Sequence, residues 1–337
     1  MMHVQRYFPG RISMREKAEP ASIADVGLLE PLTQQFVDAM AKGPTMRELS
    51  FEDARRFLAD IQSGIIGKPA VQFEDMVAPT GPTGGVPIRI VRPERASETL
   101  PALVYVHGGW TFGDKATHDR LIREIAVGAH VALFFVDYDR SLEAKYPVAI
   151  EQVYAVAKYL VEHAERLGID SARLAIVGDG IGGNMAAAVT LMAKERRGPK
   201  IDVQVLFYPA VSLMFDTGSY ASFANGPWLT RQAMETFWSA YLPDAAARKQ
   251  ITAAPLNASI DQLTGLPDAL VIVAENDVLR DEGECYARKL ARAGVRVTST
   301  RYNGTIHDFV MLNALADTPA ARGAIAQTNA LLRSILE

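Results

Sequence analysis

The chain has 337 residues, 49% of them hydrophobic, and its 35 basic and 39 acidic residues give a net charge of −4 at pH 7. This length and composition predict one large globular domain or two smaller ones, and the lack of a basic cluster argues against a nucleic-acid partner. The only cysteine, Cys285, excludes an intramolecular disulfide and a thiolate metal cluster. We therefore expect a globular protein without a metal site.

The first ten residues lack the continuous apolar core of a signal peptide. No stretch of the sequence is apolar over the length that a membrane span requires. We expect a soluble, cytoplasmic protein that has no contact with a membrane.

Residues 1–70 are predicted to form a helical amino-terminal cap segment. Apolar residues recur at the spacing of one helix face from Leu28 to Phe36, and again from Phe51 to Ile61. Ser50, with Asp53 three residues later, is typical of the start of a helix.

Residues 71–337 are predicted to form an α/β domain in which short strands alternate with helices. The strands are almost entirely apolar and the helices are amphipathic, which is typical of a mostly parallel central sheet with helices on both faces. The predicted strands are 87–92, 102–106, 131–136, 173–177, 203–207, 269–274 and 296–301, and the predicted helices are 147–167, 182–196, 282–293 and 320–336.

An insertion at about 212–262 interrupts this alternation between the fifth and sixth predicted strands, and it is rich in aromatic residues. Because ligands bind at the carboxyl edge of such a sheet, an aromatic insertion at this place predicts a cap or lid over a site. The alternative is a small satellite core without a ligand. We predict that Trp228, Phe237 and Trp238 of the insertion, together with Trp110, contact a substrate.

Three segments that follow predicted strands carry the residues of a reactive site. Gly108 and Gly109 follow the second strand, where glycines allow backbone amides to face a substrate oxygen. Asp277 follows the sixth strand and His307 follows the last one. The fourth strand runs into a glycine turn and then a helix, the setting in which α/β-hydrolases present a nucleophile, and Gly180 is at the apex of that turn.

The chain order of this turn, Asp277 and His307 matches the Ser-Asp-His order of α/β-hydrolases. The sequence resembles the hormone-sensitive-lipase branch of that family, whose bacterial carboxylesterases carry Gly-Asp-Ser-Ala-Gly-Gly and His-Gly-Gly-Gly motifs. The resemblance covers nearly the whole chain and implies an α/β-hydrolase fold with a helical cap. It also implies that Asp277 and His307 are the catalytic acid and base, and it allows a homodimer. The amides implied for the oxyanion hole are those of Gly108, Gly109 and Ile181, and no cofactor is implied.

The sequence departs from the family pattern at two places. Gly180 occupies the position of the serine nucleophile and has no side chain. Trp110 follows two glycines instead of three, so the oxyanion loop is one residue shorter, and its amides must be placed accurately to act. Because loss of a triad serine typically lowers turnover about a millionfold, we do not expect serine-dependent hydrolysis from this sequence.

The histidines outside the predicted site have no predicted role in it. We predict that His118, His130 and His163 are surface residues.

The series Gly178-x-Gly180-x-x-Gly183 formally fits a dinucleotide-binding fingerprint. The acid twenty residues on, Asp202, precedes a strand instead of ending one, so a nicotinamide-dependent oxidoreductase is disfavoured.

Three functional hypotheses follow. In the first, which we favour, the chain is a diverged enzyme that uses Asp277 and His307 for general acid–base chemistry on a small hydrophobic carbonyl compound, by dehydration, elimination, cyclisation or isomerisation. In the second, it is a carboxylesterase whose catalytic serine has been replaced by Gly180. In the third, it is a non-catalytic protein that binds a small molecule. Retention of both Asp277 and His307 disfavours the third hypothesis.

Overall fold

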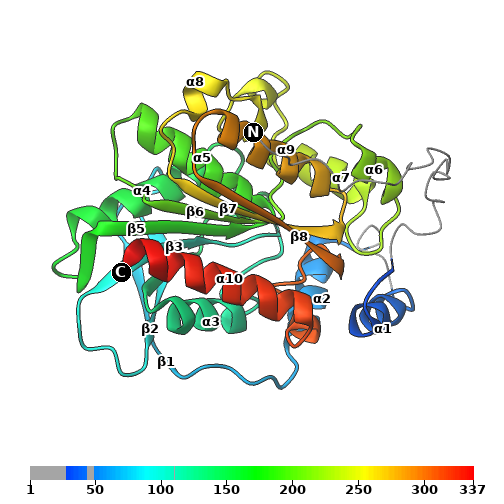
Figure 1. Cartoon of the computed structure of the whole chain (residues 1–337), viewed down its shortest axis with the longest axis horizontal. Helices are drawn as coiled ribbons and strands as arrows, with labels where there is room; N and C mark the ends of the chain where they lie inside the picture. Colours follow the sequence, from blue (N-terminus) through cyan, green and yellow to red (C-terminus); the bar gives the residue numbers. More distant parts are fainter. Residues whose placement is uncertain (1–27, 44–48, 110) are drawn as a thin grey trace, which may run out of the picture.

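The computed structural model describes residues 28–43, 49–109 and 111–337, and it contains an eight-stranded sheet with helices on both faces (Figure 1). The strand order is β1-β2-β4-β3-β5-β6-β7-β8; β1 and β2 are antiparallel to their neighbours and the other strands run parallel. The strands are β1 Val71–Ala78, β2 Val86–Pro93, β3 Leu100–Val106, β4 Ala132–Val136, β5 Ile169–Asp179, β6 Val203–Phe207, β7 Asp268–Asn276 and β8 Val297–Ile306. The mostly parallel sheet is therefore confirmed.

Helices cover the sheet, precede it and fill the long segment between β6 and β7 (Figure 1). The α-helices are α1 Pro31–Met40, α2 Phe51–Gln62, α3 Asp119–Ala129, α4 Val148–Glu162, α5 Ile181–Glu195, α6 Gly218–Ser222, α7 Arg231–Tyr241, α8 Ile260–Leu263, α9 Arg280–Arg292 and α10 Pro319–Leu336, and the short 3₁₀ helices include η4 Asn313–Leu315. No helix in the described part of the chain has both the length and the apolar content needed to span a bilayer.

Alternate residues of the central strands face two separate hydrophobic cores. In β3, Leu103 and Tyr105 pack with residues of α3 and α10, whereas Ala102, Val104 and Val106 pack with residues of α4, α5 and α9. All five side chains are fully buried. A strand that is buried on both faces must be apolar at every position, which is why these strands were recognisable in the sequence.

Strand β1 and helix α3 were missed by the sequence analysis, and helices α6, α7 and α8 within the predicted insertion were not predicted either. Strand β1 is an edge strand, and Gln72–Asp75 in it are exposed, so it has little apolar signal. Helix α3 does carry apolar residues at helical spacing, from Leu121 to Ala126, and this signal was overlooked. The predicted helix start at Ser50 is confirmed, because its hydroxyl accepts a hydrogen bond from the Asp53 amide at 3.1 Å.

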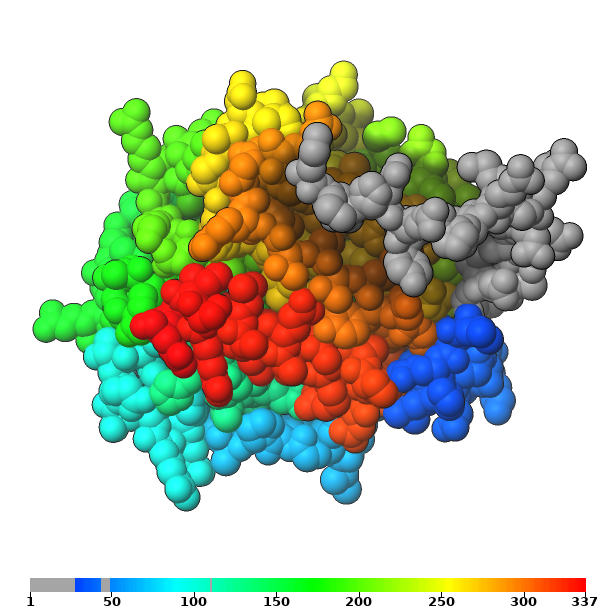
Figure 2. Space-filling view, viewed as in Figure 1, coloured from blue at the N-terminus to red at the C-terminus, as the bar shows by residue number. Residues whose placement is uncertain are grey.

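The helices α1 and α2 lie beside the carboxyl edge of the sheet. Both pack against η4, and α1 also contacts β8. Figure 2 shows the blue segment of α1 against the orange segment that follows β8. Phe36, Ala54 and Leu58 of these helices are buried in the same core as α3 and α10. The chain before the sheet thus adds a wall at the edge where the parallel strands end.

Helix α5 begins directly after β5 and touches the backbone at the end of β3. A Cβ atom at Gly182 would overlap the Val106 carbonyl oxygen and the backbone of His107. Only a glycine permits this distance between helix and strand, and the contact places the first turn of α5 beside the loop that follows β3.

We expect Gly182→Ala to lower the free energy of unfolding by about 1–3 kcal/mol, since backbone atoms cannot move aside as a flexible side chain can. Urea unfolding followed by circular dichroism measures the change. Gly67→Ala is the matched control, because a Cβ atom at Gly67 meets nothing within 4 Å. Equal unfolding midpoints for the two variants would contradict this account.

Candidate active site

The predicted site residues meet at the carboxyl ends of neighbouring strands. Gly180 follows β5, Asp277 follows β7 and His307 follows β8. In the sheet order these strands and β6 lie side by side, so residues far apart in the sequence come together. The structure therefore brings the three residues into one site.

Gly180 forms a sharp turn between β5 and α5. Its φ of 53° and ψ of −118° lie in a region that side chains of L-residues rarely adopt. A Cβ atom built on Gly180 would lie 3.5 Å from Nε2 of His307 and 4.0 Å from Cα of Gly108. The turn thus directs its missing side chain toward the outer nitrogen of the histidine, and there is space for that side chain.

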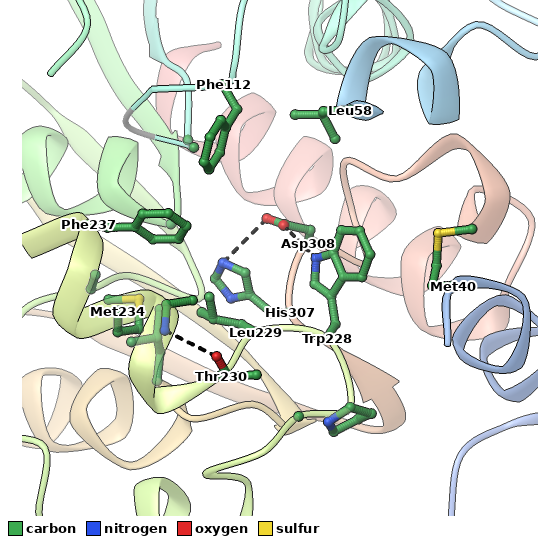
Figure 3. A pocket seen from close by; sticks show the side chains of 18 of the residues that line it. Met40, Leu58, Phe112, Trp228, Leu229, Thr230, Met234, Phe237, His307 and Asp308 are labelled. Atoms are coloured by element: carbon green, nitrogen blue, oxygen red, sulfur yellow. Dashed lines mark hydrogen bonds and ion pairs between the residues drawn. The ribbon is translucent and has the colours of Figure 1, made fainter. Parts of the chain in front are cut away.

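His307 has a carboxylate at each ring nitrogen, and Figure 3 shows the one that belongs to Asp308. Its Nδ1 donates to Oδ2 of Asp277 at 2.7 Å, and its Nε2 lies 3.4 Å from Oδ1 of Asp308. The Tyr208 ring packs against the imidazole edge to face, with a centroid distance of 4.7 Å. Asp308 was not singled out in the sequence analysis, and only its place directly after His307 could have drawn attention to it.

These carboxylates determine the protonation state of His307. Burial lowers the pKa of the imidazole, but the charges of Asp277 and Asp308 and the hydrogen bond to Asp277 outweigh burial and raise the pKa to about 9. Burial raises the pKa of Asp308, and the His307 charge opposes that rise. His307 is therefore an imidazolium at neutral pH and becomes a neutral base only above about pH 9.

A second buried network lies below the site and is centred on Asp179. Its Oδ1 accepts from the Tyr105 hydroxyl at 2.7 Å and from the Gly108 amide at 3.1 Å, and its Oδ2 lies 3.3 Å from Nε2 of His118. Burial lowers the pKa of His118, but the Asp179 charge more than compensates and raises it. The prediction of a surface position for His118 is wrong, because its side chain is 1% exposed in an ion pair with Asp179.

The loop after β3 is held from several sides. The Gly108 amide donates to Asp179, so of the three amides considered for the oxyanion hole this one is already engaged inside the protein. Ile181 is the first residue of α5, and the first amides of a helix have no acceptor within the helix. Arg55 of α2 donates to the Thr111 carbonyl and forms a bidentate ion pair with Glu143 at 2.8 and 3.0 Å.

His107 supports this loop from below. Burial lowers the pKa of His107 to about 3, so its ring is neutral. Its Nδ1 donates to the Gly108 carbonyl at 2.9 Å, and the ring stacks on Tyr138 with a centroid distance of 4.2 Å. A neutral, stacked histidine fixes the loop and takes no direct part in the chemistry above it.

A cavity of about 930 Å³ opens above Gly180 and His307. Its walls come from α1 and α2, from the loop after β3, from the segment between β6 and β7, and from the turn after β8; Figure 3 shows a part of them. The apolar lining includes Met40, Leu58, Phe112, Trp228, Leu229, Met234, Phe237 and Met311. A cavity of this volume and lining fits a small or medium hydrophobic molecule.

The four aromatic residues predicted to contact a substrate have different positions. Trp228 and Phe237 line the cavity. Trp238 is 1% exposed and packs near Tyr241 in the interior instead of lining the cavity. Trp110 lies outside the described residues. The residues that α1 and α2 contribute, such as Met40 and Leu58, were not predicted, although their helical pattern was recognised.

The cavity contains few groups that could bind an ion. Asp308 is the only Asp, Glu, Lys or Arg among the described residues that line it. No group of three or more His, Cys, Asp or Glu with the geometry of a metal site occurs within the described ranges. The arrangement offers an uncharged ligand an apolar cavity, a histidine, a carboxylate and nearby backbone amides.

Comparisons with known proteins agree with this geometry. Residues 103–311 match a family described as alpha/beta hydrolase fold. A thermostable esterase from Pseudomonas putida ECU1011 is 44% identical over 92% of this chain and 98% of its own, with a TM-score of 0.90. A fungal esterase from Rhizomucor miehei is 37% identical over 91% of this chain and 96% of its own, with a TM-score of 0.86. Carboxylesterase NlhH of Mycobacterium tuberculosis is 32% identical over 91% of this chain and 96% of its own length.

We expect Asp277→Asn to lower the pKa of His307 from about 9, because the variant removes the charge of the carboxylate nearest to Nδ1. Nitrogen NMR of the imidazole against pH measures the shift. Asp261→Asn, at an exposed aspartate of α8, is the control and should leave the titration unchanged. An unaltered titration in Asp277→Asn would show that this contact does not set the histidine's charge.

Asp179→Ala should lower the free energy of unfolding by about 3–5 kcal/mol, since it leaves the buried His118 without its counter-charge. Chemical denaturation at pH 7 measures the loss. Asp268→Ala removes a partner from the ion pair with the exposed Arg296 and should have a much smaller effect. If the two variants were equally stable, the Asp179 network would not have the structural role described above.

Proposed function

The chain belongs to the α/β-hydrolase fold family, and we propose that it uses His307 and Asp277 for general acid–base chemistry on a small hydrophobic carbonyl compound. The observation that carries the proposal is the combination of a histidine oriented by Asp277 with a nucleophile position that has no side chain; the two neighbouring carboxylates raise the pKa of this histidine and so favour its proton-donor form. Such a histidine can give a proton to a substrate oxygen and take it back. It cannot activate a serine that is absent.

The backbone amides beside Gly180 have a role in the same reaction. Proton abstraction next to a carbonyl creates negative charge on the carbonyl oxygen, and preorganised N–H groups stabilise such a charge. We assign this role to the amides of Gly109 and Ile181, because the Gly108 amide donates to Asp179. Ile181 is the first residue of α5, directly after Gly180, and it lines the cavity.

The cavity supports an uncharged, hydrophobic substrate. Lysine and arginine are absent from the described lining residues, so a carboxylate ligand would have no cationic side chain there except the histidines. A free carboxylate would also be repelled by Asp308. We propose that Trp228 and Phe237 contact the apolar part of the substrate and that its carbonyl group lies over Gly180.

A second candidate function is that of a carboxylesterase whose serine has been replaced. Two observations favour it. A side chain on Gly180 would start 3.5 Å from Nε2 of His307, and the solved relatives with 44% and 37% identity are esterases. In this case the site would keep the geometry of ester hydrolysis and lack only the nucleophile.

Gly180→Ser separates the two candidates. The first predicts little hydrolysis of p-nitrophenyl butyrate by either the unaltered protein or the serine variant, because Trp110 follows two glycines where the family pattern has three. It also predicts that the unaltered protein catalyses exchange of the α-protons of benzylacetone in deuterated water, measured by proton NMR. His307→Gln should lose this exchange.

The possible outcomes are distinct. Ester hydrolysis by Gly180→Ser alone, with no α-proton exchange by the unaltered protein, would favour the replaced esterase and refute the first candidate. Neither activity in either protein would leave only a binding role. In the serine variant, His307→Gln is the control for hydrolysis, which should disappear with the histidine.

A further inference from the structure

We propose that Asp308 is a second catalytic residue that accepts a proton from the substrate while His307 donates one, and that the pair eliminates water from hydrophobic β-hydroxy carbonyl compounds. This inference rests on the proposed acid–base function and extends it to a second group and a substrate class. It is carried by the position of Asp308, by its backbone conformation and by its place as the only acidic side chain among the described residues that line the cavity.

Asp308 lies where a substrate proton acceptor is needed. Its Oδ1 is 3.4 Å from Nε2 of His307, on the side of the ring that faces away from Asp277. Its side chain is 19% exposed and lines the cavity, and Figure 3 shows the carboxylate between His307 and Trp228. A substrate in the cavity can therefore touch both the imidazole and the carboxylate.

The carboxylate is held in this position by the backbone and by the lid. Asp308 has a φ of +65°, an uncommon conformation for a residue with a side chain and one that concentrates at functional sites. Its carbonyl accepts from the amides of Met311 and Leu312 at 2.8 and 2.9 Å, which fixes the turn. The indole of Trp228 donates to Oδ2 at 2.9 Å and leaves Oδ1 on the side of His307.

The two residues can start the reaction in complementary protonation states. His307 is protonated below about pH 9. The charged groups that act on Asp308 are His307, Asp277, Asp179 and His118, and the imidazolium of His307 favours the ionised carboxylate. Burial favours the neutral acid, which makes the carboxylate a better proton acceptor than an exposed one. One group thus begins as an acid and the other as a base.

The elimination balances without another reactant. Asp308 takes the proton from the carbon next to the carbonyl, and the electron pair of that C–H bond forms the new C=C bond. The C–O bond to the β-hydroxyl breaks, and the leaving oxygen takes a proton from Nε2 of His307 to form water. The products are an α,β-unsaturated carbonyl compound and water. A proton then returns from Asp308 to His307 across their 3.4 Å contact, which restores the starting state.

Asp308→Asn tests the proposal, because it keeps the size of the side chain and an oxygen for the Trp228 N–H group but removes the base. The probe is the aldol of benzaldehyde and acetone, whose conversion to benzylideneacetone is followed by ultraviolet absorbance. We expect the variant to lose a hundredfold or more in turnover, as is typical for the loss of a general base. Asp317→Asn, at an exposed aspartate before α10, is the matched control and should keep full activity.

A second measurement separates a catalytic from a structural role. Benzylacetone has no β-hydroxyl to lose, so its α-proton exchange in deuterated water reports the base alone. Asp308→Asn should lose exchange while its thermal unfolding and its intrinsic tryptophan fluorescence stay near those of the unaltered protein. Normal exchange and elimination in Asp308→Asn, with both lost in His307→Gln, would overturn the role of Asp308 and leave the proposed function intact. No exchange in the unaltered protein would overturn both.

Discussion

The buried carboxylate of Asp179 connects the parts of the chain on which the site depends. It ends β5, and it binds the Gly108 amide, the Tyr105 hydroxyl and the His118 imidazole. Because an unpaired charge is very costly in the protein interior, this set of contacts must form together or not at all. The glycine turn, the end of β3 and the start of α3 are therefore fixed relative to one another before any substrate arrives.

Above this network, two carboxylates determine the charge of the histidine. In a serine hydrolase the outer nitrogen of the histidine faces a hydroxyl group. Here it faces the carboxylate of Asp308, and the inner nitrogen faces Asp277. Two negative groups around one imidazole favour the charged ring.

Much of the fold was visible in the sequence because strands buried on both faces must be apolar throughout, whereas the exposed edge strand β1 gave little signal. The meeting of Gly180, Asp277 and His307 was also predictable, since parallel strands end at one edge. The directions in which the side chains point could not be predicted from the sequence. Phe237 and Trp238 are neighbours on α7, yet one lines the cavity and the other is buried beside Tyr241. His118 joins Asp179 across 61 residues of chain, and no local pattern marks such a pair.

The two helices that precede the sheet are also part of the cavity wall. Gln62 of α2 donates to the carbonyls of Thr117 and Met311, and Arg55 donates to the carbonyl of Thr111. The same helix thus binds the loop after β3 and the turn after His307 and Asp308. Ligand binding in the cavity and the docking of these two helices are then thermodynamically linked: whatever free energy the docked helices add to ligand binding, the ligand must return in equal amount to their docking.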